Sequence, residues 1–378
     1  MNERLRALKC SRCGRVFEPD KTAYTCECGG ILETLYDCTD VRFEGKDMWR
    51  YSALLPAGKR TKLSVGGTPL YEWGAYGARI LLKDETRNPS GSLKDRASAA
   101  VVSVAKSMGY EKISCASTGN AGVSLACLCA SEGFESYIFV PKTAAPQKLA
   151  QMRAYGADII AIDATYDDCY DICNSVSRER GYYNRNTAYN PYTIDGKKTV
   201  AFEIAEQLDF RAPSFVFVPV GDGCILSGVW KGFRELKACG LMEELPVLIG
   251  VQADGCAPLA NAFCDREHEC KPDTMAESIA VCKPRNGFMA LRDVRASGGH
   301  FTTVSDDEMF ESLKLLASET GIFAELASAS AIAAIMKETS EGRIDESDEC
   351  VALITGSGLK DAHALGLLRS EVERDAAA

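Results

Sequence analysis

From about Gly67 onward the chain repeats one pattern: a short apolar run, then a loop of Gly, Ser, Thr and Asn, then an amphipathic segment with helical periodicity. The β-branched apolar runs predict buried strands, and the segments after the loops predict helices. The four expected strand and helix pairs are 78–83 with 94–108, 112–116 with 123–132, 215–220 with 229–238, and 350–354 with 360–368. Such alternation predicts an α/β architecture with parallel sheets covered by helices. Ligands of such sheets bind beyond the carboxyl ends of the strands, where all four loops fall.

The charge of the chain limits its partners. Its 378 residues carry a formal net charge of -10, and the sequence pI is about 5.1. Binding to nucleic acid or to an anionic membrane needs a basic surface, so neither partner is expected. No apolar run reaches the roughly 18 residues that span a bilayer, and residues 1–9 contain no signal-peptide core. The expected location is therefore the cytoplasm.

Four of the 17 cysteines have the spacing of metal ligands. Cys10 and Cys13 form a CxxC knuckle, and Cys26 and Cys28 follow as CxC, each knuckle followed by glycine. Two thiolate knuckles at this separation suit a small tetrahedral zinc ribbon with a structural role. The alternative is a pair of hairpin turns with reduced cysteines and no metal. Residues 1–40 are therefore expected to form a separate zinc-ribbon-like segment.

Most of the other cysteines are expected to be reduced in the cytoplasm. Five of them lie in apolar segments and are expected to act as small buried hydrophobic residues. They are Cys115, Cys127, Cys129, Cys169 and Cys173. The only histidines are His268, His300 and His363, so a Ser-His-Asp hydrolase or a histidine metal site has little support.

The first loop, 88–96, contains Lys94 at the expected start of a helix. The positive end of the helix dipole disfavours the ammonium form of a lysine there. A neutral amine among hydroxyls and backbone donors suits Schiff-base chemistry, whereas the simpler alternative is a solvated surface lysine.

The second loop combines glycines with the start of a helix, and its backbone N–H groups suit a carboxylate. Its candidate residues are Ser117, Thr118, Gly119 and Asn120. The alternative is an ordinary capped turn.

The third and fourth loops follow two further expected strands. The third is a Gly-rich turn that opens a helix and is typical of a phosphate site. It consists of Gly221, Asp222, Gly223, Cys224 and Ile225, and Leu226 replaces the third glycine of a dinucleotide fingerprint. The fourth loop supplies the hydroxyls of Thr355 and Ser357, which would leave a pyridine nitrogen unprotonated.

Taken together, the loops resemble those of the threonine synthase family, within the tryptophan-synthase-β-like enzymes of fold type II that use pyridoxal 5'-phosphate (PLP). The matching landmarks occur in the family's order along nearly the whole chain. They are 66–70, 88–96, 117–120, 148–157, 196–208, 251–259 and 355–361. The resemblance implies two open parallel-sheet domains within residues 41–378, the smaller at about 100–200.

The resemblance also implies a role for each candidate residue. Lys94 would carry the internal aldimine and move protons, and Asn120 would bond the ring oxygen. The backbone of residues 221–225 would hold the cofactor phosphate, and Thr355 or Ser357 would face the pyridine nitrogen. The substrate carboxylate would lie on Ser117, Thr118 and Gly119. A homodimer is likewise implied by the family alone.

Five positions depart from the family's pattern for binding the phosphate of O-phosphohomoserine. They are Thr187, Ala188, Thr193, Ile225 and Met289, which stand where the family commonly has Asn, Ser, Arg, Asn and Lys. Charge-assisted hydrogen bonds contribute about 1.5–3 kcal/mol each, so losing an Arg and a Lys weakens phosphate binding.

The expected activity is therefore a PLP-dependent carbon-oxygen lyase or synthase that eliminates or replaces a group at Cβ or Cγ of a small amino acid. Threonine synthase proper is the best-known enzyme of this kind, and the alternatives are a serine/threonine ammonia-lyase and a β-replacing synthase of the cysteate-synthase type. The non-enzymatic alternative is an amino-acid-sensing module with the same fold.

Overall fold

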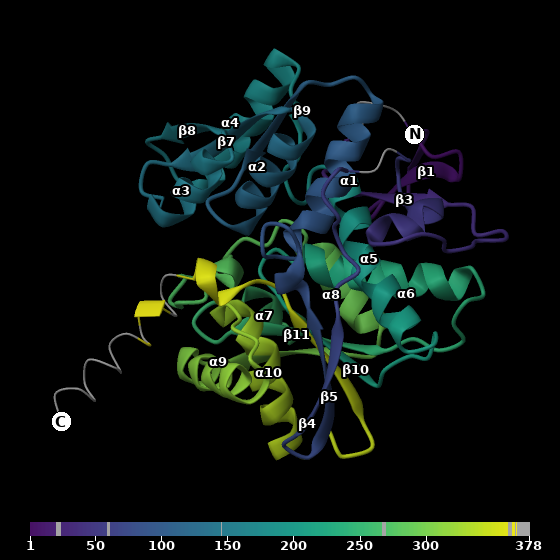
Figure 1. Ribbon diagram of the computed structural model, residues 1–378, viewed down its shortest axis with the longest axis vertical. Coiled ribbons are helices and arrows are strands. Elements are labelled where there is room, and N and C mark those ends of the chain that lie inside the picture. Colours follow the sequence, from purple (N-terminus) through teal and green to yellow (C-terminus); the bar gives the residue numbers. More distant parts are fainter. Residues whose placement is uncertain are drawn as a thin grey trace. The chain divides into compact units, whose positions relative to one another are not determined.

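The computed structural model describes residues 1–19, 24–58, 61–144, 146–266, 270–361, 365–366 and 368 (Figure 1). The chain forms two compact units, and each is described by itself. The first unit contains Met1–Gly67, Asn88–Glu206 and Ser227–Glu243; the second contains Thr68–Arg87, Gln207–Leu226 and Glu244–Ala378. His268 and His363 lie outside the described residues.

The first unit begins with a small antiparallel ribbon. Its strands are β1 (Leu5–Cys10), β2 (Val16–Phe17) and β3 (Leu32–Tyr36), with β1 in the centre. The 3-10 helix η1 (Met48–Leu54) follows and buries Met48, Trp49, Tyr51 and Leu54.

The ribbon is fastened to the rest of its unit by a buried charge cluster. Asp195 accepts hydrogen bonds from Thr34 Oγ1 (2.6 Å) and from Tyr36 Oη (2.7 Å). Lys198 Nζ lies 3.0 Å from the same carboxylate, and Lys231 Nζ donates to the carbonyl of Thr34 at 2.6 Å. Burial opposes ionisation of Asp195, but the two ammonium groups outweigh it and lower the pKa of this carboxyl.

The main sheet of the first unit has four parallel strands. In order they are β8 (Asp158–Ile162), β7 (Glu135–Pro141), β6 (Lys112–Ala116) and β9 (Tyr183–Asn184). Ile113 and Cys115 of β6 belong to the core that includes α1 (Lys94–Ser107) and α2 (Asn120–Glu132). Ala116 instead packs with α4 (Tyr166–Arg180). The helices α3 (Pro146–Ala154) and α5 (Tyr192–Gln207) complete the unit.

The second unit contains a sheet of six strands. In order they are β12 (His300–Val304), β11 (Val247–Ala253), β10 (Phe215–Pro219), β13 (Glu349–Ile354), β5 (Ala78–Asp84) and β4 (Leu70–Ala75). All neighbours are parallel except β4 and β5, which form an antiparallel edge. The helices α9 (Asp306–Thr320) and α10 (Leu326–Ser340) share a core with Phe217, Ile249 and Ala352.

Shorter elements connect the strands of the second unit. They are α7 (Pro258–Phe263), α8 (Gly287–Ala296) and the 3-10 helices η2 (Glu85–Arg87), η3 (Glu277–Ile279) and η4 (Gly358–Lys360). The helix α6 (Cys224–Ala238) begins in the second unit, and its residues from Ser227 onward belong to the first.

The two expected parallel sheets are thus confirmed, with differences at the ends of helices. Helices α2 and α6 begin at Asn120 and Cys224, earlier than the expected 123 and 229, because the glycine-containing loops turn directly into helical backbone. Of the helix expected over 360–368, the described residues show η4 at its start and helical backbone at 365, 366 and 368. In the part of the chain that the structure describes, no helix is long and apolar enough to cross a bilayer. The antiparallel β4 was not foreseen.

Candidate active site and cysteine clusters

Lys94 lies where the sequence places it, as the first residue of α1, and is half-buried. The loop before it is fixed by Asp95. Both the backbone N–H and the hydroxyl of Ser90 donate to the Asp95 carboxylate, each at 2.6 Å. The amine of Lys94 is therefore carried on a rigid turn at the positive end of a helix dipole.

A buried ion pair supports the turn that carries Lys94. Arg96 donates to both carboxylate oxygens of Glu203 at 2.7 Å, and both side chains are almost fully buried. The Glu203 carboxylate also accepts the N–H of Gly67 at 2.7 Å. A Cβ on Gly66 would lie 2.6 Å from this carboxylate, so glycine is required there. The sequence alone gave this pair no role, although a charged residue within an apolar helix was a usable signal.

The second loop has the geometry of an anion site. Ser117 is buried, and its Oγ accepts the N–H of Gly119 at 3.2 Å. Gly119 caps α2 in an extended conformation, and a Cβ there would meet no atom within 4 Å. Thr118 and Asn120 are half-buried beside it. A helix N-terminus with open space before it can accept a carboxylate.

A buried arginine follows β9, the strand that pairs with β6, and β6 leads into this loop. Arg185 is fully buried and donates from Nη1 to Thr187 Oγ1 (2.9 Å) and from Nε to Ser98 Oγ (3.3 Å). Ser98 stands four residues after Lys94 on α1, on the same helix face. Among the described residues, Arg185 Nη2 has no hydrogen-bond partner. A buried charge without a carboxylate is costly, so this guanidinium is a candidate anion ligand that the sequence did not reveal.

The five positions that depart from the family's pattern are buried or half-buried, and their side chains make different contacts. Thr193 is fully buried, and its hydroxyl donates to the carbonyl of Asn190 at 2.8 Å, which leaves it committed to the start of α5. Ala188 (φ 58°), Ile225 and Met289 are also buried, and Thr187 accepts from Arg185. None of these five side chains carries a charge.

In the second unit, the Gly-rich loop needs its glycines. Gly223 has φ 85°, and a Cβ there would lie 2.6 Å from Ala290 Cβ. Asp222 Oδ1 accepts the N–H of Arg285 at 3.1 Å. The first turn of α6, which begins at Cys224, contains no acidic residue. The loop and the helix start therefore offer backbone N–H groups to an anion, and they fit a phosphate.

The fourth loop joins a hydrogen-bond network that sequence analysis missed. Thr355 is buried and donates to Glu325 Oε1 at 3.1 Å, and Ser328 Oγ lies 3.0 Å from its hydroxyl. Ser357 caps η4 by accepting the N–H of Leu359. Both hydroxyls are thus on a fixed loop at the end of β13, as expected.

The candidate residues divide between the two units. Lys94 and residues 117–120 belong to the first unit, whereas residues 221–225, Thr355 and Ser357 belong to the second. Three of the loops follow a parallel strand of their own unit: 117–120 follows β6, 221–225 follows β10, and the loop of Thr355 and Ser357 follows β13. Each therefore lies at the carboxyl end of a strand, where α/β sheets bind ligands.

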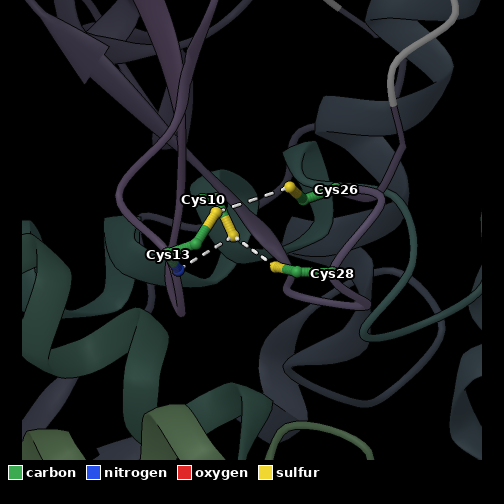
Figure 2. Close-up of side chains that lie close together, drawn as sticks. All are labelled: Cys10, Cys13, Cys26 and Cys28. Carbon is green, nitrogen blue, oxygen red and sulfur yellow. Dashed lines mark hydrogen bonds between the residues drawn. The ribbon is translucent and has the colours of Figure 1, made fainter.

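The N-terminal cysteines form one cluster, in which all four sulfurs face a common centre (Figure 2). Cys10 Sγ lies 3.4 Å from Cys28 Sγ, and Cys13 Sγ lies 3.7 Å from Cys26 Sγ. Sulfurs around a tetrahedral zinc ion are separated by about 3.8 Å, since each Zn–S bond is about 2.3 Å. A Cβ on Gly30 would lie 2.4 Å from Cys10 Sγ, which explains the glycine after the second knuckle. The four thiols therefore fit a zinc ion.

The thiols of this cluster titrate unequally. Burial raises the pKa of Cys10, but the N–H groups of Cys13 and Arg12 outweigh it and bring its pKa to about 6. A backbone N–H from Cys28 lowers the pKa of Cys26, but burial and the neighbouring thiols raise it to about 11. One thiol thus ionises readily and makes the next ionisation harder, as expected in a cluster that a cation would stabilise.

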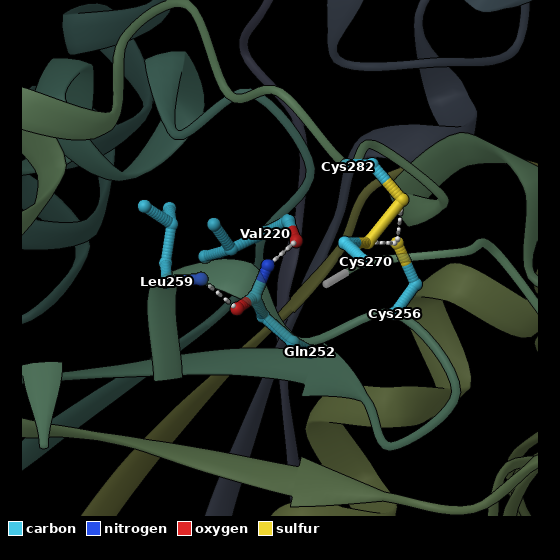
Figure 3. Close-up of a disulfide and its surroundings, with 6 residues drawn as sticks. All are labelled: Val220, Gln252, Cys256, Leu259, Cys270 and Cys282. Carbon is cyan, nitrogen blue, oxygen red and sulfur yellow. Dashed lines mark hydrogen bonds between the residues drawn. A yellow bond between two sulfur atoms is a disulfide. The ribbon is translucent and has the colours of Figure 1, made fainter. Parts of the chain in front are cut away.

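The other cysteines show one departure from the expected reduced state. The five cysteines in apolar segments are buried, as expected. Cys270 and Cys282, however, form a disulfide, and Cys256 lies beside it (Figure 3). The expectation of reduced thiols was based on the compartment, and it carried no information about which cysteines the fold brings together.

Comparisons with known proteins indicate the family of the chain. Residues 61–356 match the family model described as "Pyridoxal-phosphate dependent enzyme". The threonine synthase of Methanocaldococcus jannaschii is 39% identical, with 94% of this chain and 93% of that protein covered. The threonine synthase of Methanosarcina acetivorans is 35% identical over 94% and 92%. The structure of maize serine racemase has a TM-score of 0.68 at 20% identity, covering 81% of this chain and 92% of that one, and shows the shared fold alone.

Proposed function

We propose that this chain, which belongs to the threonine synthase family of pyridoxal-phosphate-dependent enzymes, uses Lys94 to hold its cofactor and to move the proton at the substrate α-carbon. The family makes it a PLP-dependent lyase or synthase that acts on a small amino acid. The observation that carries the proposal is the position of Lys94, the first residue of α1, on a turn fixed by Asp95 and by the Arg96–Glu203 pair.

The remaining residues have separate roles in this proposal. The backbone of residues 221–225 binds the cofactor phosphate, and Asn120 bonds the ring oxygen. Thr355 or Ser357 faces the pyridine nitrogen, and residues 117–119 hold the substrate carboxylate. When bound, PLP withdraws electrons from the α-carbon and so makes its proton removable. The Lys94 amine accepts that proton as a general base and returns it as the acid.

The reaction is the elimination or replacement of a group at Cβ or Cγ of an amino acid. Its leaving group is not held as in the family's usual phosphate pocket, because Thr193 and Met289 replace an Arg and a Lys. The Thr193 hydroxyl is already used by the carbonyl of Asn190, so it cannot stand in for the missing charge.

One observation favours a particular second candidate, a β-replacing synthase of the cysteate-synthase type. The buried Arg185 keeps a positive charge near Thr187 and bonds to Ser98, which lies one helical turn after Lys94 on α1. It suits an anionic group on a shorter substrate such as O-phosphoserine. The side chains of serine and threonine are neutral and would not need that charge.

A substrate panel tests the proposal. The purified chain is loaded with PLP, and O-phosphohomoserine, O-phosphoserine, serine and threonine are added separately. We expect a visible cofactor band that borohydride bleaches, and a shift of this band with O-phosphoserine above all. A shift with O-phosphohomoserine alone, together with threonine formation, would restore the family's usual substrate. A chain that remains colourless after loading would contradict the cofactor proposal.

The N-terminal cluster is proposed to hold a structural zinc ion, and the enzyme is proposed to be a cytoplasmic homodimer. Metal analysis of the native chain and of a Cys10→Ser/Cys13→Ser variant, which keeps two of the four thiols, tests the proposed zinc site, with one equivalent of zinc expected in the native chain and none at this cluster in the variant. Light scattering of the holoenzyme tests the proposed homodimer. Loss of zinc is expected to lower the thermal midpoint and to leave the band of bound cofactor in place, because the cluster is remote in sequence from every cofactor loop.

A further inference from the structure

A second group of three cysteines lies in the other unit. The sulfurs of Cys256, Cys270 and Cys282 all lie within 4.8 Å of one another. Cys256 follows β11 and immediately precedes α7, whereas the other two come from the loop between α7 and α8. Cys256 Sγ lies 3.6 Å from Cys270 Sγ and 3.9 Å from Cys282 Sγ (Figure 3).

The backbone is shaped to bring these cysteines together. A Cβ on Gly255 would lie 1.8 Å from the carbonyl oxygen of Asp273, and the N–H of Asp273 donates to the carbonyl of Gly255 at 3.1 Å. Glycine at 255 therefore allows the segment after Cys270 to contact the turn that carries Cys256. The convergence is a property of the fold and involves three separate positions in the chain.

A disulfide accounts for two of the three sulfurs and leaves Cys256 unexplained. Cys256 is buried beside the disulfide, and the two sulfurs of that disulfide are already bonded to each other. A metal ion could instead engage all three sulfurs, because it displaces thiol protons when it binds. The distances from Cys256 to both neighbours are those of sulfurs around zinc, about 3.8 Å. They resemble the 3.4 and 3.7 Å of the N-terminal cluster.

We propose that Cys256, Cys270 and Cys282 bind one zinc ion once the Cys270–Cys282 disulfide is reduced. Reduction needs two electrons and two protons, which a cellular dithiol supplies as it becomes a disulfide. The three thiols then lose three protons to water as Zn²⁺ forms three Zn–S bonds. Among the described residues the cluster has three members, so a tetrahedral ion keeps its fourth position for water. Zinc and the disulfide exclude each other, so occupancy follows the redox state.

The segments that carry the three cysteines pack against the start of the Gly-rich loop of the same unit. Gln252 donates to the carbonyl of Val220 (3.2 Å) and accepts the N–H of Leu259 at 2.9 Å, which ties the start of α7 to the residue before that loop. A Cβ on Gly221 would lie 3.1 Å from the carbonyl oxygen of Ser278, in the segment that leads to Cys282. The disulfide and the zinc ion would therefore each hold together segments that pack against residues 220–221.

Cobalt titration of the full chain tests the proposal. The protein is reduced with a phosphine, which becomes the phosphine oxide, and is stripped of metal before Co²⁺ is added and its thiolate charge-transfer absorption is followed. We expect the native chain to bind one more equivalent of Co²⁺ than Cys256→Ser, and to lose that equivalent when the phosphine is omitted. Cys264→Ser is the matched control, because Cys264 is exposed and outside the cluster. The N-terminal cluster contributes equally to all three chains, so the difference isolates this site.

A measurement on the native chain covers the case in which Cys256→Ser does not fold. The reduced protein is treated with iodoacetamide with and without Zn²⁺, and the modified cysteines are located by mass spectrometry. Protection of Cys270 and Cys282 by Zn²⁺, with Cys264 modified in both samples, supports the site. Equal modification of Cys270 and Cys282 in both samples, or equal cobalt uptake by the native chain and Cys256→Ser, would overturn it.

Discussion

The positions that would hold the cofactor and those that would recognise a substrate phosphate are built differently. The expected cofactor positions are held by buried carboxylates: Asp95 fixes the turn of Lys94, and Glu325 bonds to Thr355. The positions expected for substrate phosphate carry uncharged side chains, and the Thr193 hydroxyl bonds to the carbonyl of Asn190 within the fold. The difference indicates that the reaction chemistry and the choice of substrate can change separately, because they depend on different side chains.

The largest effect is expected from removing the amine. Lys94→Ala should lower kcat by about 10²–10⁴-fold, the usual contribution of a positioned acid and base. Lys106→Ala, at the other end of α1, is the control and should retain activity. For both variants, kcat is measured from steady-state rates, and cofactor attachment is measured from the absorption band that borohydride bleaches. Full activity in Lys94→Ala would mean that the cofactor positions have been misassigned.

The substrate side is tested through Arg185. Removing a charged hydrogen-bond partner costs about 1.5–3 kcal/mol, so Arg185→Met should raise KM for an anionic substrate by about 10–150-fold. The kcat should change less, and Arg185→Lys should recover part of the affinity. Urea unfolding of each variant separates binding from stability. If the variants are less stable to urea but keep the native KM, Arg185 has a structural role and does not bind the substrate.

The Gly-rich loop offers a matched pair of glycines. Gly223 and Gly240 both have positive φ, but only at Gly223 would a Cβ meet a neighbour. Both alanine variants should lose about 1–2 kcal/mol of stability, the usual cost of this backbone conformation. Crowding adds about 1–3 kcal/mol at Gly223, so cofactor affinity should fall about 5–150-fold in Gly223→Ala alone. Equal affinities, measured by PLP titration, would remove this loop from the cofactor site.

The smallest effect is expected at the hydroxyls. A neutral hydrogen bond contributes about 0.5–1.5 kcal/mol, so the loss of one should weaken PLP binding by about 2–12-fold. Thr355→Val and Ser357→Ala are compared by the absorption band of the bound cofactor. The variant whose band moves identifies the hydroxyl that faces the pyridine nitrogen. If neither band moves, the fourth loop does not contact the ring.

Local features were predictable from the sequence, and long-range ones were not. The strand, loop and helix around Lys94 lie within one stretch of chain, where propensity and spacing decide the structure. The Arg96–Glu203 pair joins residues 107 positions apart, and no local pattern reveals such a contact. The same is true of Arg185 and of the cysteine cluster at 256–282. The antiparallel β4 is different, because it pairs with the next strand, β5, through a two-residue turn at 76–77, which is a local signal that was overlooked.

The charge cluster around Asp195 has a consequence for how the chain is made. The ribbon is translated first, but its partners Asp195 and Lys231 lie 161 and 197 residues beyond Thr34. At about 5–20 residues per second, the ribosome needs roughly 10–40 s to add them. During this interval the nascent ribbon lacks its permanent docking surface. It must rely on its own short strands and its four thiols. The order of synthesis therefore favours a ribbon that can fold without the rest of its unit.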